Sequence, residues 1–443
     1  MRALHWFRRD LRLEDNRALH AACSRADDGV VGLYVISRGE WEAHDEAGCK
    51  VDFWLRNLRE LQVGLEELNI PLIVVDAGTI ETVPGNVLQA AKDAGCDALY
   101  LNREYEINEL RRDERTAELF EKSGMAVHPF DDRTIVVPGD VVTKEGKYYT
   151  VFTPFQERWL ERIRDEGIDI CGMPRRQPDI DVASSDIPER VGGFDSHIDA
   201  SLWPAGEAEA KRRLQSFVES TIDRYKAERD SPGLDSTSAL SPYLAAGVIS
   251  PRVCFDAAAA SEGGALNFGK KAKRKTGPGT WMSELVWREF YIHISRNFPR
   301  VCMGRNFRPG YDDLPWSDDD AAFEAWCEGQ TGYPFVDAAM RQLNETGWMH
   351  NRCRMVVAMF LTKHLLIDWR KGERQFMRRL VDGDLGSNNG GWQWSASTGT
   401  DAAPYFRIYN PTTQGERYDE QGVYIRRWVP ELADVEGKEV HDP

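Results

Sequence analysis

The chain lacks the short patterns that mark the common metal, nucleotide and disulfide sites. Its eight cysteines and nine histidines form neither a Cys-x-x-Cys pair nor a His-Glu-x-x-His motif, so neither a zinc site nor a disulfide framework is indicated. Neither a Gly-x-Gly-x-x-Gly loop nor a Gly-x-x-x-x-Gly-Lys-Ser/Thr loop is present, which argues against the usual dinucleotide and triphosphate sites. We therefore expect no metal, and we interpret the thiols as incidental residues in a reducing compartment.

Long apolar segments are also missing. No run reaches the length of about 18 apolar residues that a membrane-spanning helix requires. The first residues, MRALHWFRRDLRLEDN, are too charged for a signal peptide, and their apolar stretch is too short. The sequence therefore predicts a protein of the cytoplasm or the nucleus, and its 443 residues are enough for two or three domains.

Acidic residues outnumber basic ones, and the excess lies in the first half of the chain. Residues 1–200 hold 25 Lys and Arg against 39 Asp and Glu (net −14), whereas residues 201–443 hold 31 against 33 (net −2), which together give −16. The densest basic segment, GKKAKRKTGPG at 269–279, lies in the second half. Such a segment is either a solvated loop or a contact to a phosphate backbone, so a nucleic-acid partner stays open.

Short apolar segments alternate with helical patterns over the first 130 residues. The strand candidates are LHWFR, VVGLYVI, PLIVVDA, ALYLNREY and AVHPF, and KVDFWLRNLRELQVGLEELN has the apolar spacing of a helix. This alternation predicts a doubly wound parallel sheet. We expect this α/β domain at 1–130, an irregular linker rich in Pro, Gly, Ser and Asp at 131–203, and a large all-α domain at 204–443.

The segment NNGGWQW at 388–394 combines two amides, two glycines and two tryptophans, and it resembles neither a helix face nor a strand face. Adjacent glycines let a backbone approach another group closely, and paired amides offer donors and acceptors to a planar polar edge. The segment therefore indicates a site for a flat ligand.

A second unusual pattern is WMSELVWREFYIH. Three- and four-residue spacing places its aromatic and acidic residues on one helix face: Trp281, Glu284, Trp287 and Tyr291. Such a stripe is usually part of a core, but a carboxylate between two tryptophans is unfavourable there unless it is paired or faces a ligand. In GWMHNRCRM, Asn351 and Met355 share a face, which fits a site as well as it fits the exposed start of a helix.

Longer stretches closely resemble the photolyase/cryptochrome family from residue 4 to about residue 440. They are WFRRDLRLEDN, ELVWREFY, TGYPFVDAAMRQLNETGWMHNRCRM, LLIDWR and DGDLGSNNGGWQWSASTGTDAAPYFRIYNPTTQGERYD. Trp287 and Met355 match the class I cyclobutane pyrimidine dimer photolyases, because (6-4) photolyases usually carry histidines on the helix of 351–355. Asn388 also matches the repair enzymes, since plant cryptochromes typically have an aspartate there and animal cryptochromes a cysteine.

The resemblance implies a light-driven lyase that repairs cyclobutane pyrimidine dimers in DNA. Electron transfer from photoexcited FAD, reduced and anionic in the active form, would open the cyclobutane ring of a dimer flipped out of the duplex. The expected FAD-binding residues are Tyr225, Arg229, Thr237, Ser238, Ser241, Trp281, Asn351, Arg354, Asp382, Asp384 and Asn388. Arg354 and Asp382 would pair beside the flavin ring, and Asn388 would donate a hydrogen bond to its N5 edge.

The same resemblance implies the catalytic and DNA-binding residues. Glu284 would stabilise the dimer radical anion, Asn388 the reduced flavin, and a chain of Trp392, Trp369 and Trp316 would carry electrons between the surface and the flavin. The expected DNA-binding residues are Glu284, Trp287, Arg352, Met355, Trp394 and Arg407. The arginines would hold phosphates, and the indoles would stack on bases.

An antenna chromophore is expected in the α/β domain. His44, Asn108 and Glu109 match relatives that bind methenyltetrahydrofolate, whose amino-pterin ring needs an acceptor such as Glu109. Met303 stands where the best-known folate-binding relatives carry lysine. A deazaflavin antenna, or no antenna, therefore remains an alternative.

The partner implied is UV-damaged DNA, either single- or double-stranded. We expect a cytoplasmic monomer with access to DNA, no membrane contact and no obligate protein partner. A signalling photoreceptor and a flavin reductase are the other function classes to weigh. The chain ends at KEVHDP, where we expect no signalling tail, and no nicotinamide motif supports a reductase.

Overall fold

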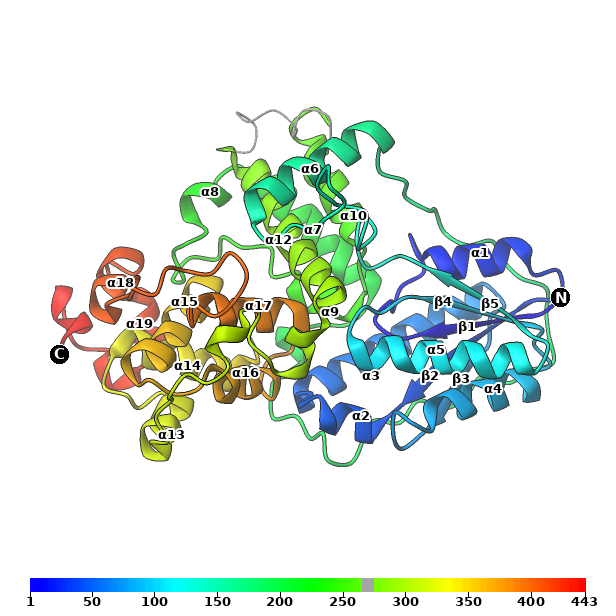
Figure 1. Cartoon of the computed structure of the whole chain (residues 1–443), viewed down its shortest axis with the longest axis horizontal. Helices are drawn as coiled ribbons and strands as arrows, with labels where there is room; N and C mark the ends of the chain where they lie inside the picture. Colours follow the sequence, from blue (N-terminus) through cyan, green and yellow to red (C-terminus); the bar gives the residue numbers. More distant parts are fainter. Residues whose placement is uncertain (265–274) are drawn as a thin grey trace.

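The structure is a computed structural model that describes residues 1–264 and 275–443. An α/β part and a helical part lie side by side, with the two termini at opposite ends of the long axis (Figure 1). Lys270, Lys271, Lys273 and Arg274 of the basic segment lie outside the described residues.

The α/β part contains a five-stranded sheet in which every pairing is parallel, as the sequence predicts. The strand order is β3-β2-β1-β4-β5. The strands are β1 (Ala3–Phe7), β2 (Val30–Ile36), β3 (Leu72–Asp76), β4 (Ala98–Asn102) and β5 (Ala126–Phe130). Ala3 on β1 pairs with Val30 on one side and with Ala98 on the other, so the first strand is central.

Helices cover both faces of the sheet because successive strand residues point to opposite faces. The helices are α1 (Arg17–Arg25), α2 (Arg38–Ala43), α3 (Gly48–Glu67), α4 (Val83–Asp93) and α5 (Ile107–Lys122). On β1, Ala3 and Phe7 join the core that includes α1 and α3, whereas Leu4 and Trp6 join the core that includes α4 and α5.

The segment expected to be an irregular linker contains a regular helix. Helix α6 (Phe152–Glu166) is followed by an extended, mostly irregular stretch and by the short 3-10 helix η1 (Ala200–Leu202). The buried face of α6 includes Phe155 and Trp159, and the Trp159 indole donates to Glu289 at 2.7 Å. This apolar spacing lies within a stretch whose overall composition is polar, which is why composition alone predicted a linker. The domain boundaries at 130 and 203 stay a prediction.

The remaining part is helical. It contains α7 (Glu207–Ser220), α8 (Tyr225–Glu228), α9 (Ser241–Ala246), α10 (Pro251–Ala260), α12 (Gly277–Asn297), α13 (Asp320–Glu328), α14 (Pro334–Thr346), α15 (Asn351–Met359), α16 (Trp369–Met377), α17 (Leu385–Ser395), α18 (Pro411–Tyr418) and α19 (Val423–Trp428). Shorter turns are η3 (Pro299–Met303), η4 (Pro309–Tyr311), the π-helical η5 (Phe360–His364), η6 (Pro430–Leu432) and η7 (Gly437–His441). Among the described residues, no helix is both long and apolar enough to span a membrane.

Buried charges join the two parts. Arg252 on α10 is fully buried, and its guanidinium donates to Asp15 Oδ2 at 2.8 Å and to Asp132 Oδ1 at 2.6 Å. Arg133 bridges Glu106, which precedes α5, and Asp384, which precedes α17, at 2.9 and 3.0 Å. A buried charge is tolerated only when it is paired, so these contacts hold the two parts in one relative position.

Candidate active site

A cavity of about 530 Å³ opens between α8, α9, α12, α15 and α17 in the helical part. Its volume lies within the range of roughly 300–1,000 Å³ for small-molecule and cofactor sites. Its lining includes sixteen of the residues expected to bind FAD, to bind DNA or to carry electrons: Tyr225, Arg229, Thr237, Ser238, Ser241, Trp281, Glu284, Trp287, Asn351, Arg354, Met355, Asp382, Asp384, Asn388, Trp392 and Trp394. The structure thus brings together residues that are dispersed over 170 positions, from 225 to 394.

One wall of the cavity is the stripe on α12. Trp281 is buried and its indole Nε1 lies 3.3 Å from the Ser238 hydroxyl, whereas Glu284 and Trp287 are half-buried. Glu284 forms an ion pair with Arg229, which resolves the problem of a carboxylate between tryptophans. The Trp287 ring stacks on Phe152 of α6 with 3.6 Å between centroids, so its outer face is the one available to a ligand.

The segment NNGGWQW forms the middle of helix α17, so the expectation that it is not helical is wrong. Asp384 caps the helix by accepting from the Ser387 amide at 3.0 Å. A Cβ on Gly390 would lie 2.1 Å from the Tyr291 ring of α12, whereas a Cβ on Gly391 would meet nothing within 4 Å. The first glycine therefore permits close helix packing, and the second leaves the helix backbone open to the cavity.

Two buried aspartates stand beside the cavity with different partners. One guanidinium nitrogen of Arg354 lies 3.0 and 2.8 Å from the two carboxylate oxygens of Asp382, the pairing expected from the sequence. For Asp384, burial acts to raise the pKa, but the guanidinium groups of Arg133 and Arg288 outweigh burial and hold the pKa well below its usual range. Asp384 therefore stays ionised and keeps its role as a helix cap.

The other end of the cavity carries hydroxyl groups. Thr237 and Ser238 lie in the loop before α9, and Ser241 begins that helix and accepts from the Trp348 indole at 3.1 Å. Ala239 in this loop has a φ of +48°, a left-handed conformation that is unusual for a residue with a side chain. Tyr225 of α8 is buried here with Arg229 over its ring at 5.4 Å.

Helix α15 presents Asn351 and Met355 together. Asn351 is exposed at the start of the helix, and its amide nitrogen lies 4.0 Å from the Met355 sulfur. His350 caps this helix through Nδ1, which accepts from the Arg352 amide at 3.2 Å. Burial lowers the pKa of His350 to about 4, so the imidazole is neutral and able to accept that bond near pH 7.

Asn388 is held by the backbone of the neighbouring helix. Its Nδ2 donates to the Glu373 carbonyl oxygen at 3.0 Å, which commits a donor to the protein and leaves the acceptor Oδ1 for a ligand. The second N–H of Nδ2 is also available to a ligand, so the donor role expected from the resemblance stays a prediction. The Glu373 side chain itself accepts from Asn389 Nδ2 at 2.7 Å.

Replacing Glu373 by Gln is expected to remove a loss of stability that occurs as the pH rises from about 4.5 to about 7. Burial raises the pKa of Glu373 to about 7 from an ordinary value of 4.5, although the bond from Asn389 lowers it. Because the pKa of Glu373 is higher in the folded protein than in the unfolded chain, the protonated carboxyl adds to the free energy of unfolding. This contribution is complete below about pH 4.5 and is lost as the pH rises through 7. We expect the free energy of unfolding of the wild type, relative to Glu373→Gln, to fall by at most about 3 kcal/mol between pH 5 and pH 8.

Urea unfolding of the flavin-loaded protein at both pH values measures this difference. Glu416→Gln, on the exposed side of α18, is the matched control and should show no such change. Parallel pH dependence in the wild type and in Glu373→Gln would contradict the prediction.

Of the residues expected to bind FAD, to bind DNA or to carry electrons, four lie outside the cavity lining. Arg352 forms an ion pair with Asp230 at 2.8 Å and stacks over the Tyr418 ring at 4.3 Å, and Arg407 is exposed on the loop before α18. Trp369 is fully buried at the start of α16, and its indole donates to Asn306 at 2.9 Å. Trp316 is half-buried.

The three tryptophans expected to form an electron chain occupy neighbouring elements. Trp392 on α17 packs against α16, where a Cβ on Gly372 would lie 2.2 Å from its ring. Trp369 begins α16, and the bridge between Ser317 and Ile367 places Trp316 close to that helix start. Trp326 is a fourth indole in this region, with its ring 6.0 Å from that of Trp392.

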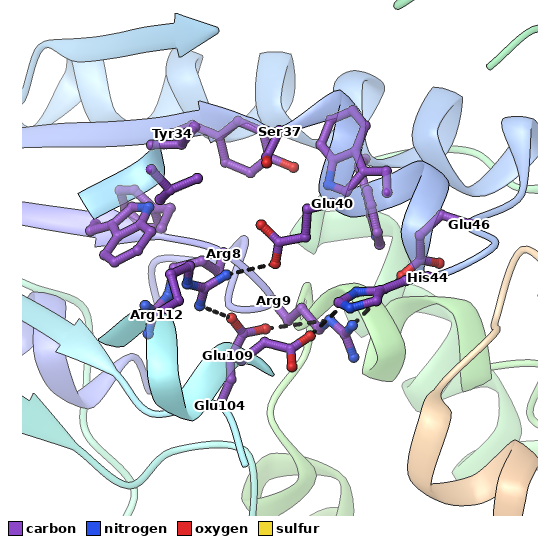
Figure 2. A pocket seen from close by; sticks show the side chains of 16 residues that line it. Arg8, Arg9, Tyr34, Ser37, Glu40, His44, Glu46, Glu104, Glu109 and Arg112 are labelled. Carbon is purple, nitrogen blue, oxygen red and sulfur yellow. Dashed lines mark hydrogen bonds and ion pairs between the residues drawn. The ribbon is translucent and has the colours of Figure 1, made fainter. Parts of the chain in front are cut away.

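The three residues expected to bind an antenna lie together in the α/β part, where His44 and Glu109 line a small pocket (Figure 2) and Asn108 contacts His44. His44 Nε2 is 3.1 Å from Asn108 Nδ2, and His44 Nδ1 is 3.6 Å from Glu109 Oε1. Burial, reinforced by the nearby carboxylates of Glu106 and Glu104, raises the pKa of Glu109 to about 8. Glu109 is therefore mostly protonated at neutral pH.

Glu40, His44 and Glu109 offer ligand atoms that all lie within 4.8 Å of one another, the spacing of a metal site. However, Glu40 accepts from Arg112 at 2.9 Å, and Arg9 lies beside Glu104 at 3.4 Å. A cation would have to compete with these guanidinium groups, so we assign no metal to the cluster.

Several site residues were missed by the sequence interpretation. Phe152, which backs Trp287, lies in the range taken for linker, and Arg133, which fixes Asp384, lies at the start of that range. Arg288 lines the cavity and could have been found, because it follows Glu284 by four residues on the same helix. Glu373 carries no local signal that marks it as a site residue.

Comparison with known proteins yields one family over nearly the whole chain. The family model described as DNA photolyase matches residues 3–175, and the model of the FAD binding domain of DNA photolyase matches residues 281–443. A protein of Salmonella typhimurium named deoxyribodipyrimidine photo-lyase is 43% identical over 441 residues, which are 99% of this chain and 91% of that protein.

Two solved structures share the fold. A bacterial class III photolyase from Agrobacterium tumefaciens superposes with a TM-score of 0.86 at 35% identity, covering 100% of this chain and 89% of the other. An archaeal photolyase from Sulfolobus tokodaii superposes with a TM-score of 0.80 at 31% identity, covering 100% of this chain and 93% of the other. That structure was solved with two FAD molecules and is described as implying a novel light-harvesting cofactor.

Proposed function

This chain belongs to the DNA photolyase family, and we propose that the cavity between α12, α15 and α17 holds its FAD and receives the damaged bases. Light-driven repair of cyclobutane pyrimidine dimers in DNA is the activity of this family member, and the helical part is its FAD-binding domain. The observation that carries the proposal is the convergence of the expected FAD-binding and dimer-binding residues on a single cavity.

The cavity fits FAD in both size and chemistry. One end offers the hydroxyls of Thr237, Ser238 and Ser241 to a pyrophosphate, and the other offers the planar indole of Trp392, whose buried Nε1 has no hydrogen-bond partner among the described residues. Reduced FAD, once bound, supplies an excited-state electron to the dimer and takes it back after the ring has opened.

The residues of this chain bind and orient the flavin. The Arg354–Asp382 pair fixes a cation at the cavity wall, and Asn388 offers Oδ1 to a ring N–H. Gly391 lets a planar ring approach the backbone of α17, where a Cβ would otherwise stand.

The mouth of the cavity suits two flipped-out bases. The free face of Trp287 and the ring of Trp394 provide stacking surfaces, and Met355 adds a polarisable apolar contact. Glu284 and Asn351 offer groups to the pyrimidine edges, so Glu284 must exchange part of its contact with Arg229 for a contact with the substrate. Arg229, which is paired with Glu284, supplies a cation close to the place where negative charge develops on the dimer.

Two arginines outside the cavity lining hold the DNA strand in this proposal. We assign this role to Arg407, which is exposed, and to Arg352, which must give up Asp230 to reach a phosphate. The protein acts as a cytoplasmic monomer in this proposal, and its eight cysteines, all within the described residues, are free thiols, which supports a reducing compartment.

For the antenna, we propose a folate-type pterin at His44, Asn108 and Glu109. The mutual contacts of these three side chains support the assignment, because a pterin needs both donors and an acceptor in one plane. The second FAD of the Sulfolobus tokodaii photolyase is the reason to test flavins as well.

The proposed site is tested by recovery of thymine absorbance from irradiated oligothymidylate, with reduced protein under blue light and in darkness. We expect light-dependent recovery in the wild type and weakened substrate binding in Trp287→Ala, since one base–aromatic stack contributes about 1–3 kcal/mol. Trp287→Phe keeps a ring on Phe152 and should retain most of the binding. Equal binding by Trp287→Ala and the wild type would refute the assignment of the mouth.

A further inference from the structure

The carboxyl ends of β1 and β4 form the point where the strand order of the sheet reverses. Doubly wound sheets bind their ligands in the crevice at this point, because the connecting loops diverge there. In this chain the crevice is the pocket lined by Trp6, Tyr34 and Ser37 and by a group of charged residues (Figure 2). We call Arg8, Arg9, Glu40, Glu104 and Arg112 the crevice cluster.

The crevice cluster pairs its charges internally. Arg112 on α5 donates to Glu40 Oε1 at 2.9 Å and to Glu104 Oε2 at 2.6 Å. Arg9, which follows β1, lies 3.4 Å from the other oxygen of Glu104. The side chains of these four residues are at most 12% exposed, so the pairs are held away from solvent.

Two guanidinium groups stack on the indole that forms the floor of the crevice. The guanidinium carbon of Arg8 lies 4.4 Å from the centroid of the Trp6 ring, and that of Arg112 lies 4.9 Å from it. Arg8 is anchored at 3.1 Å to Asp113. Planar guanidinium groups therefore cover the aromatic surface on which a flat ring system would stack.

Little space remains beside the cluster. The void in the crevice is about 50 Å³, against the roughly 300–1,000 Å³ of ordinary cofactor sites. Such a space holds only a few waters. A tricyclic ring could enter only by displacing Arg112, which would leave the buried carboxylate of Glu40 without its cation and Glu104 with Arg9 alone.

We propose that the crevice cluster is a built-in plug that excludes a flavin or deazaflavin antenna from the crevice of the sheet, with Arg112 as the specificity-determining residue. A chromophore is then restricted to the edge of the pocket at His44, Asn108 and Glu109, whose contacts with one another do not involve the plug. This inference deepens the antenna part of the proposed function and rests on it.

FMN binding to the FAD-loaded protein tests the plug. The wild type is compared with a variant that opens the crevice while removing the charges together, Arg112→Ala with Glu40→Gln and Glu104→Gln. We expect the wild type to take up no FMN and the opened variant to gain one FMN per chain, measured by equilibrium dialysis. Glu109→Gln, which changes the edge of the pocket and leaves the cluster intact, is the matched control and should take up no FMN.

Two results would overturn the plug. One is uptake of one FMN per chain by the wild type, with Trp6→Ala abolishing that uptake. This result does not depend on whether the opened variant folds. The other is an opened variant that keeps its FAD and its light-driven repair but takes up no FMN. Failure of the proposed function has a different signature, since the wild type with bound FAD would then restore no thymine.

Discussion

Replacing Arg252 by Met is expected to lower the free energy of unfolding by about 3–5 kcal/mol, because two buried carboxylates lose their shared cation. Arg252 is fully buried, and it donates to Asp15 and Asp132 and also to the carbonyl oxygens of Asp132 and Thr134. Removing Arg252 leaves the buried carboxylate of Asp15 without a cation and Asp132 with Arg12 alone. Arg252→Lys keeps the charge but loses the planar guanidinium group. We therefore expect its free energy of unfolding to lie between those of the wild type and Arg252→Met.

Urea unfolding followed by circular dichroism gives this quantity for each variant. Arg212→Met is the matched control, since Arg212 pairs with Glu209 on the surface at 2.6 Å and its side chain is 65% exposed. A surface pair of this kind contributes at most about 1 kcal/mol. If Arg252→Met and Arg212→Met lower stability equally, the buried network does not hold the two parts of the chain together.

Replacing Trp369 by Phe is expected to abolish photoreduction of oxidised protein while leaving repair by chemically reduced protein intact. Trp369 is fully buried, and in the proposed chain it is the link between Trp392, which lines the cavity, and Trp316, which is half-buried, so an electron would not cross without it. Phenylalanine fills much of the same volume but is far harder to oxidise than an indole.

Photoreduction is followed by the bleaching of oxidised flavin under blue light, and repair by thymine recovery after dithionite reduction. Trp326→Phe is the matched control. The ring centroid of Trp326 lies 6.0 Å from that of Trp392, but Trp326 is not part of the proposed chain. Loss of photoreduction in Trp326→Phe with its retention in Trp369→Phe would redirect the chain through Trp326.

The sheet could be predicted because its strands carry an unambiguous local signal. β1 and β2 are largely apolar on both faces, as is typical of strands that helices cover on both sides. The helical pattern between the strands then implies that they pair in parallel. Helix α6 was missed because its apolar residues are spaced along a stretch dominated by charged and small residues. Composition averages over the stretch, whereas the fold responds to the spacing.

The cavity could be outlined from motifs, but its supporting contacts could not. Glu284 and Trp287 stand out locally because they break the pattern of an ordinary helix face. Phe152, in contrast, meets Trp287 across 135 positions of chain, and nothing around it in sequence points to that partner. The helical state of 388–394 was missed for a related reason, because Gly390 is tolerated there only through its packing on Tyr291.

The bridge of Arg133 between Glu106 and Asp384 has a consequence for light harvesting. Energy passes between two chromophores by dipole coupling, whose efficiency falls steeply with separation and depends on the angle between the transition dipoles. Glu106 directly precedes the helix that carries Asn108 and Glu109, and Asp384 caps the helix that carries Asn388. One guanidinium therefore ties the element proposed to hold the donor dye to the element proposed to hold the acceptor, and it sets the geometry on which the transfer yield depends.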